Sequence, residues 1–151
     1  MAQREIGQAW KVGLTRIILQ AGRFGGNEMI VKFVFGIFPA FVQYKEVEAD
    51  REVKNYASGW NIIIEPKYEC DEGILQHELQ HVRQWYRNGF SLRRYRESIT
   101  YRLKCELEAY LKQMKYPKCD GSYLTKERAA ECLTWNRYGF NITKEQALEL
   151  L

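Results

Sequence analysis

The sequence predicts an α+β fold: a small antiparallel or mixed sheet packs on an N-terminal helix and a central helix, and a mostly helical half follows. Three observations support this prediction. A chain of 151 residues has the length of one domain. Its content of 46% hydrophobic and 28% charged residues is ordinary for a globular protein and excludes a collagen-like or wholly disordered chain. The spacing of apolar residues is helical, then alternating, then helical again.

The N-terminal part is expected to contain one helix and the sheet. Residues 3–21 carry apolar side chains at helical spacing, and Gly22 ends this helix. The segments 29–35, 41–49 and 60–66 are rich in β-branched and aromatic residues, which is typical of strands. We expect about three strands, most simply in one antiparallel sheet.

Beyond Pro66 the pattern of apolar residues is helical. One helix is expected at residues 71–88, with Gly89 as its stop. A second is expected at residues 91–115, because Pro117 follows it.

Two shorter helices are predicted near the C-terminus, at residues 125–139 and 143–151. Each follows a threonine cap, Thr125 or Thr143, and Thr143 with Gln146 fits a capping box. The chain is predicted to be one domain, divided into residues 1–66 with the first helix and the sheet, 67–115 with the long helix pair, and 116–151 as a helical cap.

The cysteines and the apolar segments bear on location. The four cysteines include no CxxC pair, so we expect free thiols in a reducing compartment; Cys119 with Cys132 is the first pair to test if the protein is secreted. Lys11 and Arg16 interrupt the apolar residues of the N-terminus, so no secretory signal is expected. The most apolar run, residues 29–42, is shorter than the roughly 20 residues of a membrane span. The net charge of +4 is too small to name a partner.

The chain has two histidines, and both lie in the segment "GILQHELQHVRQ", residues 73–84. On a helix, His77 and His81 project from one face, so both imidazoles can reach one metal ion. Glu78 follows His77, where its carboxylate can reach a metal-bound water without binding the metal. This is the HExxH arrangement of two ligands and a general base. The alternative is a pair of surface or core histidines without a metal.

A helical wheel separates two faces of this helix. Gln84 lies one turn beyond His81, so it is either a hydrogen-bonding partner of that ligand or a solvated helix residue. The apolar face carries Leu75, Leu79, Val82 and Tyr86, and the opposite face carries Ile74, His77, His81 and Gln84.

A catalytic zinc site usually takes three protein ligands, and no third histidine exists. Glu106 borders the predicted buried stripe of the second long helix, whereas Glu108 points away from it, so we prefer Glu106. Glu97 and Cys105 are less favoured candidates, and a salt bridge to a nearby arginine is the non-metal alternative for Glu106. The predicted stripe comprises Ile99, Leu103, Leu107, Tyr110 and Met114.

The segments "HELQH" and "ELEA" together resemble the gluzincin branch of zinc metallopeptidases, which includes many small bacterial and phage-encoded proteins. The resemblance covers about residues 60–115 and implies a zincin-like fold. It implies one zinc ion held by His77, His81 and Glu106, with Glu78 as the general base for hydrolysis of a peptide or protein substrate.

Several details stay open at this stage. Tyr110 stands where some relatives carry an aspartate, so the hydrogen-bonding partner of the histidines is not identified. Residues 60–66 are either a rim that binds substrate along a sheet edge or a buried central strand. Candidate donors to the oxyanion are Tyr95, Tyr101, Tyr110 and Arg102.

Basic residues are concentrated between residues 83 and 104, where Glu97 is the one acid. A solvated helix pair is the preferred interpretation, and a nucleic-acid surface is possible but not favoured. The seven basic residues are Arg83, Arg87, Arg93, Arg94, Arg96, Arg102 and Lys104.

The alternative function is that of a non-catalytic zincin-fold structural or interaction protein, for example a phage virion or assembly component. The expected location is cytoplasmic or virion-associated.

Overall fold

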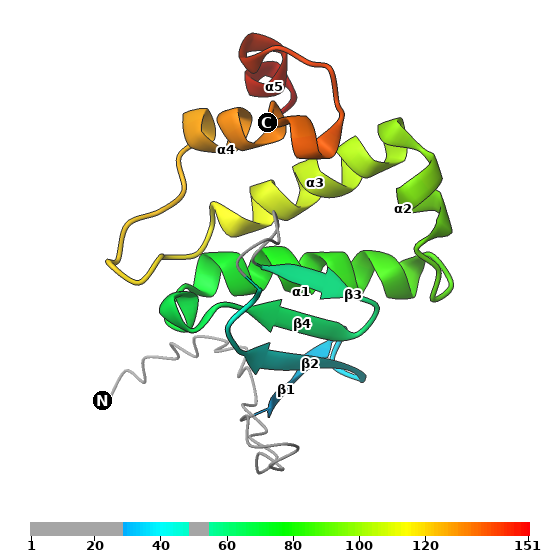
Figure 1. Cartoon of the computed structure of the whole chain (residues 1–151), viewed down its shortest axis with the longest axis vertical. Helices are drawn as coiled ribbons and strands as arrows, with labels where there is room; N and C mark the ends of the chain where they lie inside the picture. The colour runs from blue at the N-terminus through cyan, green and yellow to red at the C-terminus, as the bar shows by residue number, and fades with distance from the viewer. Residues whose placement is uncertain (1–28, 49–54) are drawn as a thin grey trace, which may run out of the picture.

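The computed structural model describes residues 29–48 and 55–151, and in this part of the chain a four-stranded sheet lies against a set of α-helices (Figure 1). The predicted α+β class is therefore confirmed. The helix predicted at residues 3–21 lies outside the described residues. No helix within the described ranges is long and apolar enough to cross a membrane.

The sheet is mixed, with the strand order β1-β2-β4-β3. Strands β1 and β2 are antiparallel, as are β3 and β4, but β2 and β4 run parallel, with Phe41 opposite Asn61. The simpler expectation of a fully antiparallel sheet is wrong, because the chain makes a long connection between β2 and β3 before it adds β4 beside β2. The strands are β1 (Met29–Val34), β2 (Phe38–Tyr44), β3 (Tyr56–Ser58) and β4 (Asn61–Ile64).

The sequence analysis missed β3, because three residues are too few for a visible alternation of apolar and polar side chains. Strand β3 is the last strand on its side of the described sheet. Strand β4 lies between β2 and β3, and its Ile62, Ile63 and Ile64 are buried. Of the two interpretations of residues 60–66, the buried central strand is the correct one.

Helix α1 (Glu72–Arg87) agrees with the prediction at both ends. The carboxylate of Asp71 caps it by accepting a hydrogen bond of 2.8 Å from the Ile74 amide. After the helix, Gly89 adopts a φ of +65°, a left-handed conformation that glycine tolerates without strain.

The second predicted helix is divided in two. Ser98 has an extended backbone that separates α2 (Arg93–Glu97) from α3 (Ile99–Gln113), and its hydroxyl caps α3 by accepting from the Tyr101 amide at 3.2 Å. The apolar spacing continues across Ser98, so the pattern alone predicts one helix here.

The C-terminal part also differs in detail from its prediction. Helix α4 (Lys126–Leu133) ends earlier than expected, and a short 3-10 helix, η2 (Asn136–Tyr138), replaces its last turn. Helix α5 (Lys144–Leu150) begins with the predicted capping box of Thr143 and Gln146.

Two hydrophobic cores lie on either side of the contact between α1 and α3. The first core joins the sheet to the apolar face of α1, and the second joins α3 to α4 and α5, which Figure 1 shows on the far side of α3 from α1. The first contains Val34, Ala40, Val42, Ile62, Ile64, Leu75, Leu79 and Val82; the second contains Tyr110, Leu124, Ala129, Ala130, Cys132, Leu133, Phe140 and Ala147.

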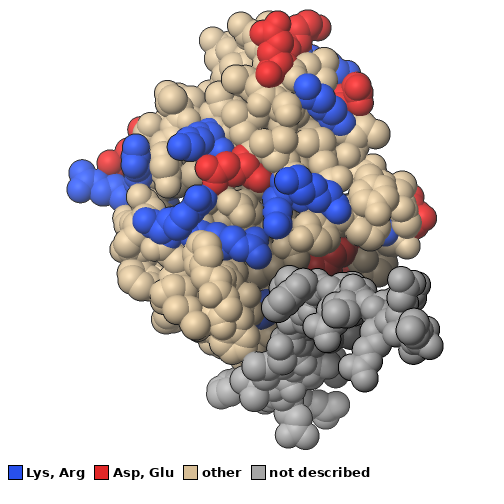
Figure 2. All heavy atoms as spheres, turned by 180° about the vertical axis from the view of Figure 1, so that it is seen from behind, with Lys and Arg blue, Asp and Glu red and all other residues tan. Residues whose placement is uncertain are grey.

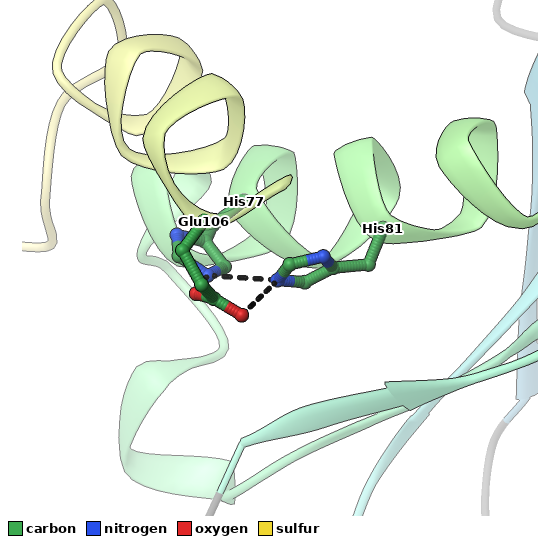
Figure 3. Close-up of side chains that lie close together, drawn as sticks. All are labelled: His77, His81 and Glu106. Atoms are coloured by element: carbon green, nitrogen blue, oxygen red, sulfur yellow. Dashed lines mark hydrogen bonds and ion pairs between the residues drawn. The ribbon is translucent and has the colours of Figure 1, made fainter. Parts of the chain in front are cut away.

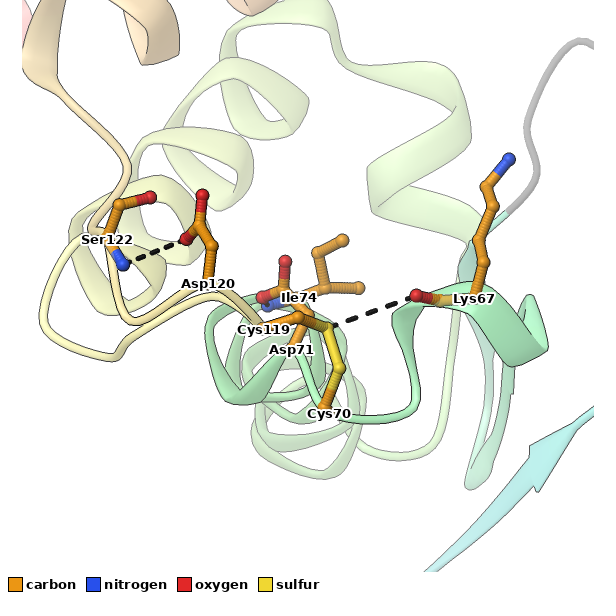
Figure 4. Close-up of a disulfide and its surroundings, with 7 residues drawn as sticks. All are labelled: Lys67, Cys70, Asp71, Ile74, Cys119, Asp120 and Ser122. Carbon is orange, nitrogen blue, oxygen red and sulfur yellow. Dashed lines mark hydrogen bonds between the residues drawn. A yellow bond between two sulfur atoms is a disulfide. The ribbon is translucent and has the colours of Figure 1, made fainter.

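A disulfide between Cys70 and Cys119 links the start of α1 to the loop between α3 and α4 (Figure 4). The expectation that all four cysteines are free is therefore wrong, whereas Cys105 and Cys132 are free and buried. The sequence did not reveal this pair, because residues separated by 49 positions come within a Cα–Cα distance of 4.9 Å only in the folded chain.

Candidate metal centre

Helix α1 brings both imidazoles to one point. The Nε2 atoms of His77 and His81 lie 3.2 Å apart, and both face the carboxylate of Glu106 (Figure 3). Both rings are largely buried, with 10% and 16% of the side chain exposed. The i, i+4 spacing has therefore produced the convergence that the sequence predicted.

Glu106 on α3 completes a cluster with the two histidines. Its Oε2 lies 3.5 Å from His77 Nε2, and its Oε1 lies 3.4 Å from His81 Nε2. One possible ligand atom from each residue lies within 4.8 Å of the other two. The predicted stripe of α3 was partly wrong, because Ile99 is exposed while Cys105 and Ala109 are buried. Glu106 is nevertheless buried, at the contact with α1.

The Glu106 carboxylate is in an environment that suits a bound cation. The residue is 2% exposed, and its Oε2 has no hydrogen-bond donor among the described residues. A buried carboxylate oxygen without a donor costs free energy, and a cation between the three side chains would remove that cost. Two imidazole nitrogens and one carboxylate oxygen are a donor set that suits zinc.

Gln84 fixes the orientation of His81. Its Oε1 lies 2.9 Å from His81 Nδ1, and its Nε2 donates to the Cys105 carbonyl at 2.9 Å and to Glu108 at 3.1 Å. This contact makes Nδ1 the protonated nitrogen of the neutral ring and leaves Nε2 as the nitrogen that faces the cluster. Of the two alternatives for Gln84, the hydrogen-bonding partner is correct, because the residue is 5% exposed.

His77 lacks a comparable partner. Its Nδ1 is buried and has no hydrogen-bond partner in the described part of the chain. The ring of Tyr110 packs against it instead, with ring centroids 4.7 Å apart. The two histidines are therefore held by different contacts, one polar and one aromatic.

The other candidate ligands lie outside the cluster. Glu108 accepts hydrogen bonds from Arg87 at 2.6 Å and Gln80 at 3.2 Å. Glu97 pairs with Arg93 on the surface. Burial raises the pKa of the Cys105 thiol to about 11, so this cysteine is protonated at neutral pH.

The cluster perturbs the pKa values of its members. Burial favours the neutral form of Glu106, but the two imidazoles outweigh this effect and hold its pKa well below 4.5. Burial also favours the neutral form of His81, but the Glu106 carboxylate outweighs it and raises the pKa of His81 from 6.5 to about 9. Without a metal, a proton on the histidine therefore balances the charge of the carboxylate.

Glu78 is buried beside the cluster. It is 5% exposed, and its Oε2 has no hydrogen-bond partner among the residues described. Burial raises the pKa of this carboxyl, and the charge of Glu106 acts in the same direction, although both imidazoles oppose it. A carboxyl of this kind, in a shared cavity with the histidines, can exchange a proton with a bound molecule.

Four groups were candidates for oxyanion donors, and the structure separates them. Tyr101 is not among the residues that line the cavity, and its ring contacts the guanidinium of Arg94. The hydroxyl of Tyr95 donates to Glu106 Oε1. Arg102 donates to three backbone carbonyls, those of Tyr95, Arg96 and Tyr138, so it supports the fold. The hydroxyl of Tyr110 lies 3.0 Å from that of Tyr138.

The C-terminal cap contributes residues to the site that the sequence analysis did not find. A cavity of about 880 Å³ extends from the histidine cluster to β3, α3 and the cap. Arg137 and Tyr138 of η2 line it, as do Arg128 and Trp135. No local motif marks these residues, because they reach the cavity through the packing of α4 and η2 on α3.

The basic stretch does not form one free surface. Figure 2 shows Lys and Arg side chains across the middle of the face opposite to that of Figure 1, with acidic side chains among them. Arg87 pairs with Glu108 at 2.6 Å, and the guanidinium of Arg94 lies 4.3 Å from the centre of the Tyr101 ring. Since Arg102 also points to backbone carbonyls, several of the seven basic residues have partners within the fold.

Comparisons with known proteins do not extend this picture. No protein-family model, no curated protein and no solved structure matches the chain.

Proposed function

We propose that this protein is a zinc-dependent metallopeptidase with a zincin-like fold. His77, His81 and Glu106 hold one zinc ion, and Glu78 is the general base. The observation that supports this proposal is a buried cluster of three convergent ligand atoms next to a fourth buried carboxyl, in a cavity of about 880 Å³. The ligand set is of the gluzincin type that the sequence resembles.

The chemistry follows from these positions. Zinc bound at the cluster supplies a Lewis acid that polarises the scissile carbonyl and lowers the pKa of a bound water to about 7. Glu78 accepts the proton of the attacking water and delivers it to the leaving amine nitrogen.

The surrounding residues hold the substrate and the ligands in place. Tyr95 donates to Glu106 and so positions the third ligand. Of the four candidate donors to the oxyanion, Tyr110 remains. Tyr138 is a new candidate, since its hydroxyl lies beside that of Tyr110 and both residues line the cavity. Strand β3 is the last strand of the described sheet, and its Tyr56 and Ala57 line the cavity, so an extended peptide can lie along it.

The general base of the proposed reaction is tested by Glu78→Gln in the zinc-loaded protein. The variant should bind as much zinc as the wild type, while hydrolysis of unstructured peptides should fall by about 10²- to 10⁴-fold. Glu97→Gln, a change on the surface of α2, is the matched control and should leave the rate unchanged.

The alternative function is a structural metal site without turnover. It would be favoured if the zinc-loaded wild type hydrolyses no peptide and His81→Ala unfolds the protein. The buried Oε2 of Glu78, which has no hydrogen-bond partner among the described residues, argues against it, because a purely structural site gains nothing from this group.

A further inference from the structure

Arg137 places a guanidinium in the wall of the same cavity as the metal cluster. It comes from η2 in the C-terminal cap, whereas His77, Glu78 and His81 come from α1, yet all four residues line one cavity. The cap is therefore part of the proposed active site, and a positive charge is its most distinctive contribution.

Two aromatic rings and one hydroxyl hold this guanidinium. Its Cζ lies 4.4 Å from the centre of the Trp135 ring and 4.9 Å from that of Tyr138, and its Nη2 donates to the Tyr138 hydroxyl at 3.2 Å. The hydroxyl of Tyr138 contacts that of Tyr110, whose ring packs on His77. The position of Arg137 is thus linked to the metal site through two tyrosines.

Two other basic residues of the cavity wall, Lys67 and Arg128, have acidic partners, which Arg137 lacks. Lys67 pairs with Glu65 at 2.8 Å, and Arg128 pairs with Glu131 at 2.9 Å. By contrast, no Asp or Glu of the described residues forms an ion pair with Arg137, and its Nε is buried without a hydrogen-bond partner. A partly buried guanidinium that forms no ion pair is costly unless a ligand supplies an acidic partner.

We propose that Arg137 binds a carboxylate of the peptide substrate. This inference rests on the proposed peptidase function and names its substrate class: peptides with an acidic group near the scissile bond. A guanidinium that contacts two rings presents a planar fork of donors, which matches a carboxylate better than an ammonium group does. The carboxylate can come from an Asp or Glu side chain or from the free C-terminus of the peptide.

The experiment uses four matched pools of peptides with the zinc-loaded full-length protein. Two pools differ only in Glu or Gln beside the scissile position, and each is made with a free or an amidated C-terminus. The quantity measured is the ratio of kcat/KM for acidic and neutral pools. We expect a preference for the acidic pool of at least about 10-fold, since a charged hydrogen bond contributes about 1.5–3 kcal/mol.

Arg137→Gln should reduce this ratio to near one, and Arg137→Lys should restore only part of it, because lysine keeps the charge but loses the fork. Arg128→Gln is the charge-matched control. It removes a cation that lines the same cavity but is already paired, so the ratio should persist. The pool that shows the preference identifies the source of the carboxylate, side chain or terminus.

Three results would overturn the inference. The first is a wild-type ratio of kcat/KM near one, and the second is a ratio that Arg137→Gln leaves unchanged. The third is an equal decrease of the ratio in Arg128→Gln, which would indicate that the positive potential of the whole cavity, and not Arg137, selects acidic peptides. Binding of the same pools to the Glu78→Gln variant separates this inference from the proposed function. If the wild type cleaves nothing but Arg137 still selects acidic peptides in this binding assay, the peptidase proposal fails and the carboxylate site stands. If neither cleavage nor binding distinguishes the pools, the carboxylate site fails.

Discussion

Helix α3 carries two glutamates on opposite sides of its contact with α1, and their surroundings differ. On the inner side, Glu106 is 2% exposed, contacts His77 and His81, and has an oxygen without a donor among the described residues. On the outer side, the Glu108 side chain is 31% exposed and pairs with Arg87 at 2.6 Å. The difference shows how to separate a ligand from a salt-bridge partner: the inner carboxylate is incompletely satisfied by the protein, whereas the outer one has ordinary partners.

The largest expected effect is on zinc affinity. Glu106→Ala should weaken zinc binding by more than about 100-fold, because loss of a group that merely orients a ligand already costs about 10- to 100-fold. Glu108→Ala should bind zinc nearly as well as the wild type. Competition with a chromophoric chelator measures both affinities. An equal loss of zinc affinity in Glu106→Ala and Glu108→Ala would contradict the assignment of Glu106, and not Glu108, as the third ligand.

A smaller effect is expected at Gln84, which links the two sides. Gln84→Ala should weaken zinc binding by about 10- to 100-fold, because His81 loses the contact that orients its ring. Gln80→Ala is the control, since the partner to which Gln80 donates among the described residues is Glu108 on the outer side. The same chelator competition measures the zinc affinity. An unchanged zinc affinity in Gln84→Ala would show that Gln84 does not orient His81 for metal binding.

The inner side should also make the stability of the metal-free protein depend on pH. The depressed pKa of Glu106 gives stability that is present above pH 4.5 and is lost as pH falls below it. The raised pKa of His81 gives stability that is complete below pH 6.5 and is lost as pH rises to about 9. The free energy of unfolding should therefore be highest between pH 4.5 and pH 6.5, where both contributions are present.

Urea unfolding in the presence of a chelator measures this pH dependence. His81→Gln should abolish the decrease between pH 6.5 and about 9, because the titrating ring is gone. A wild-type protein with the same stability at both ends of that interval would contradict the assigned interaction between His81 and Glu106.

The smallest effect is expected on the outer side. Arg87→Ala should lower the free energy of unfolding by only about 0–1 kcal/mol, because an ion pair this exposed gains little over water. Chemical denaturation of the zinc-loaded protein measures it. A loss of about 3 kcal/mol or more would be the behaviour of a buried pair and would contradict the proposed contrast.

The same contrast shows what the sequence could predict. Local spacing was sufficient for α1 and for the convergence of its histidines, since both depend on one turn of helix. For Gln84 it left two alternatives open, and the contact with His81 decides between them. The choice of Glu106 over Glu108 also agreed with the geometry, although part of the apolar stripe on which it depended was wrong. Helix α3 packs on both sides, and a single wheel cannot show two buried faces.

What the sequence analysis missed depends on contacts between distant segments. The disulfide of Cys70 with Cys119, the parallel pairing of β2 with β4 and the entry of Arg137 into the cavity each join parts of the chain that no local pattern relates. Strand β3 was missed for another reason, because its three residues are held by pairing with β4 rather than by their own pattern.

X-ray absorption at the zinc edge tests the metal site most directly. The zinc-loaded protein should show two imidazole ligands and oxygen ligands at about 2.0–2.2 Å, with no sulfur, since both free thiols lie outside the cluster. A shell of sulfur at about 2.3 Å, or a spectrum with fewer than two imidazoles, would contradict coordination by His77, His81 and Glu106.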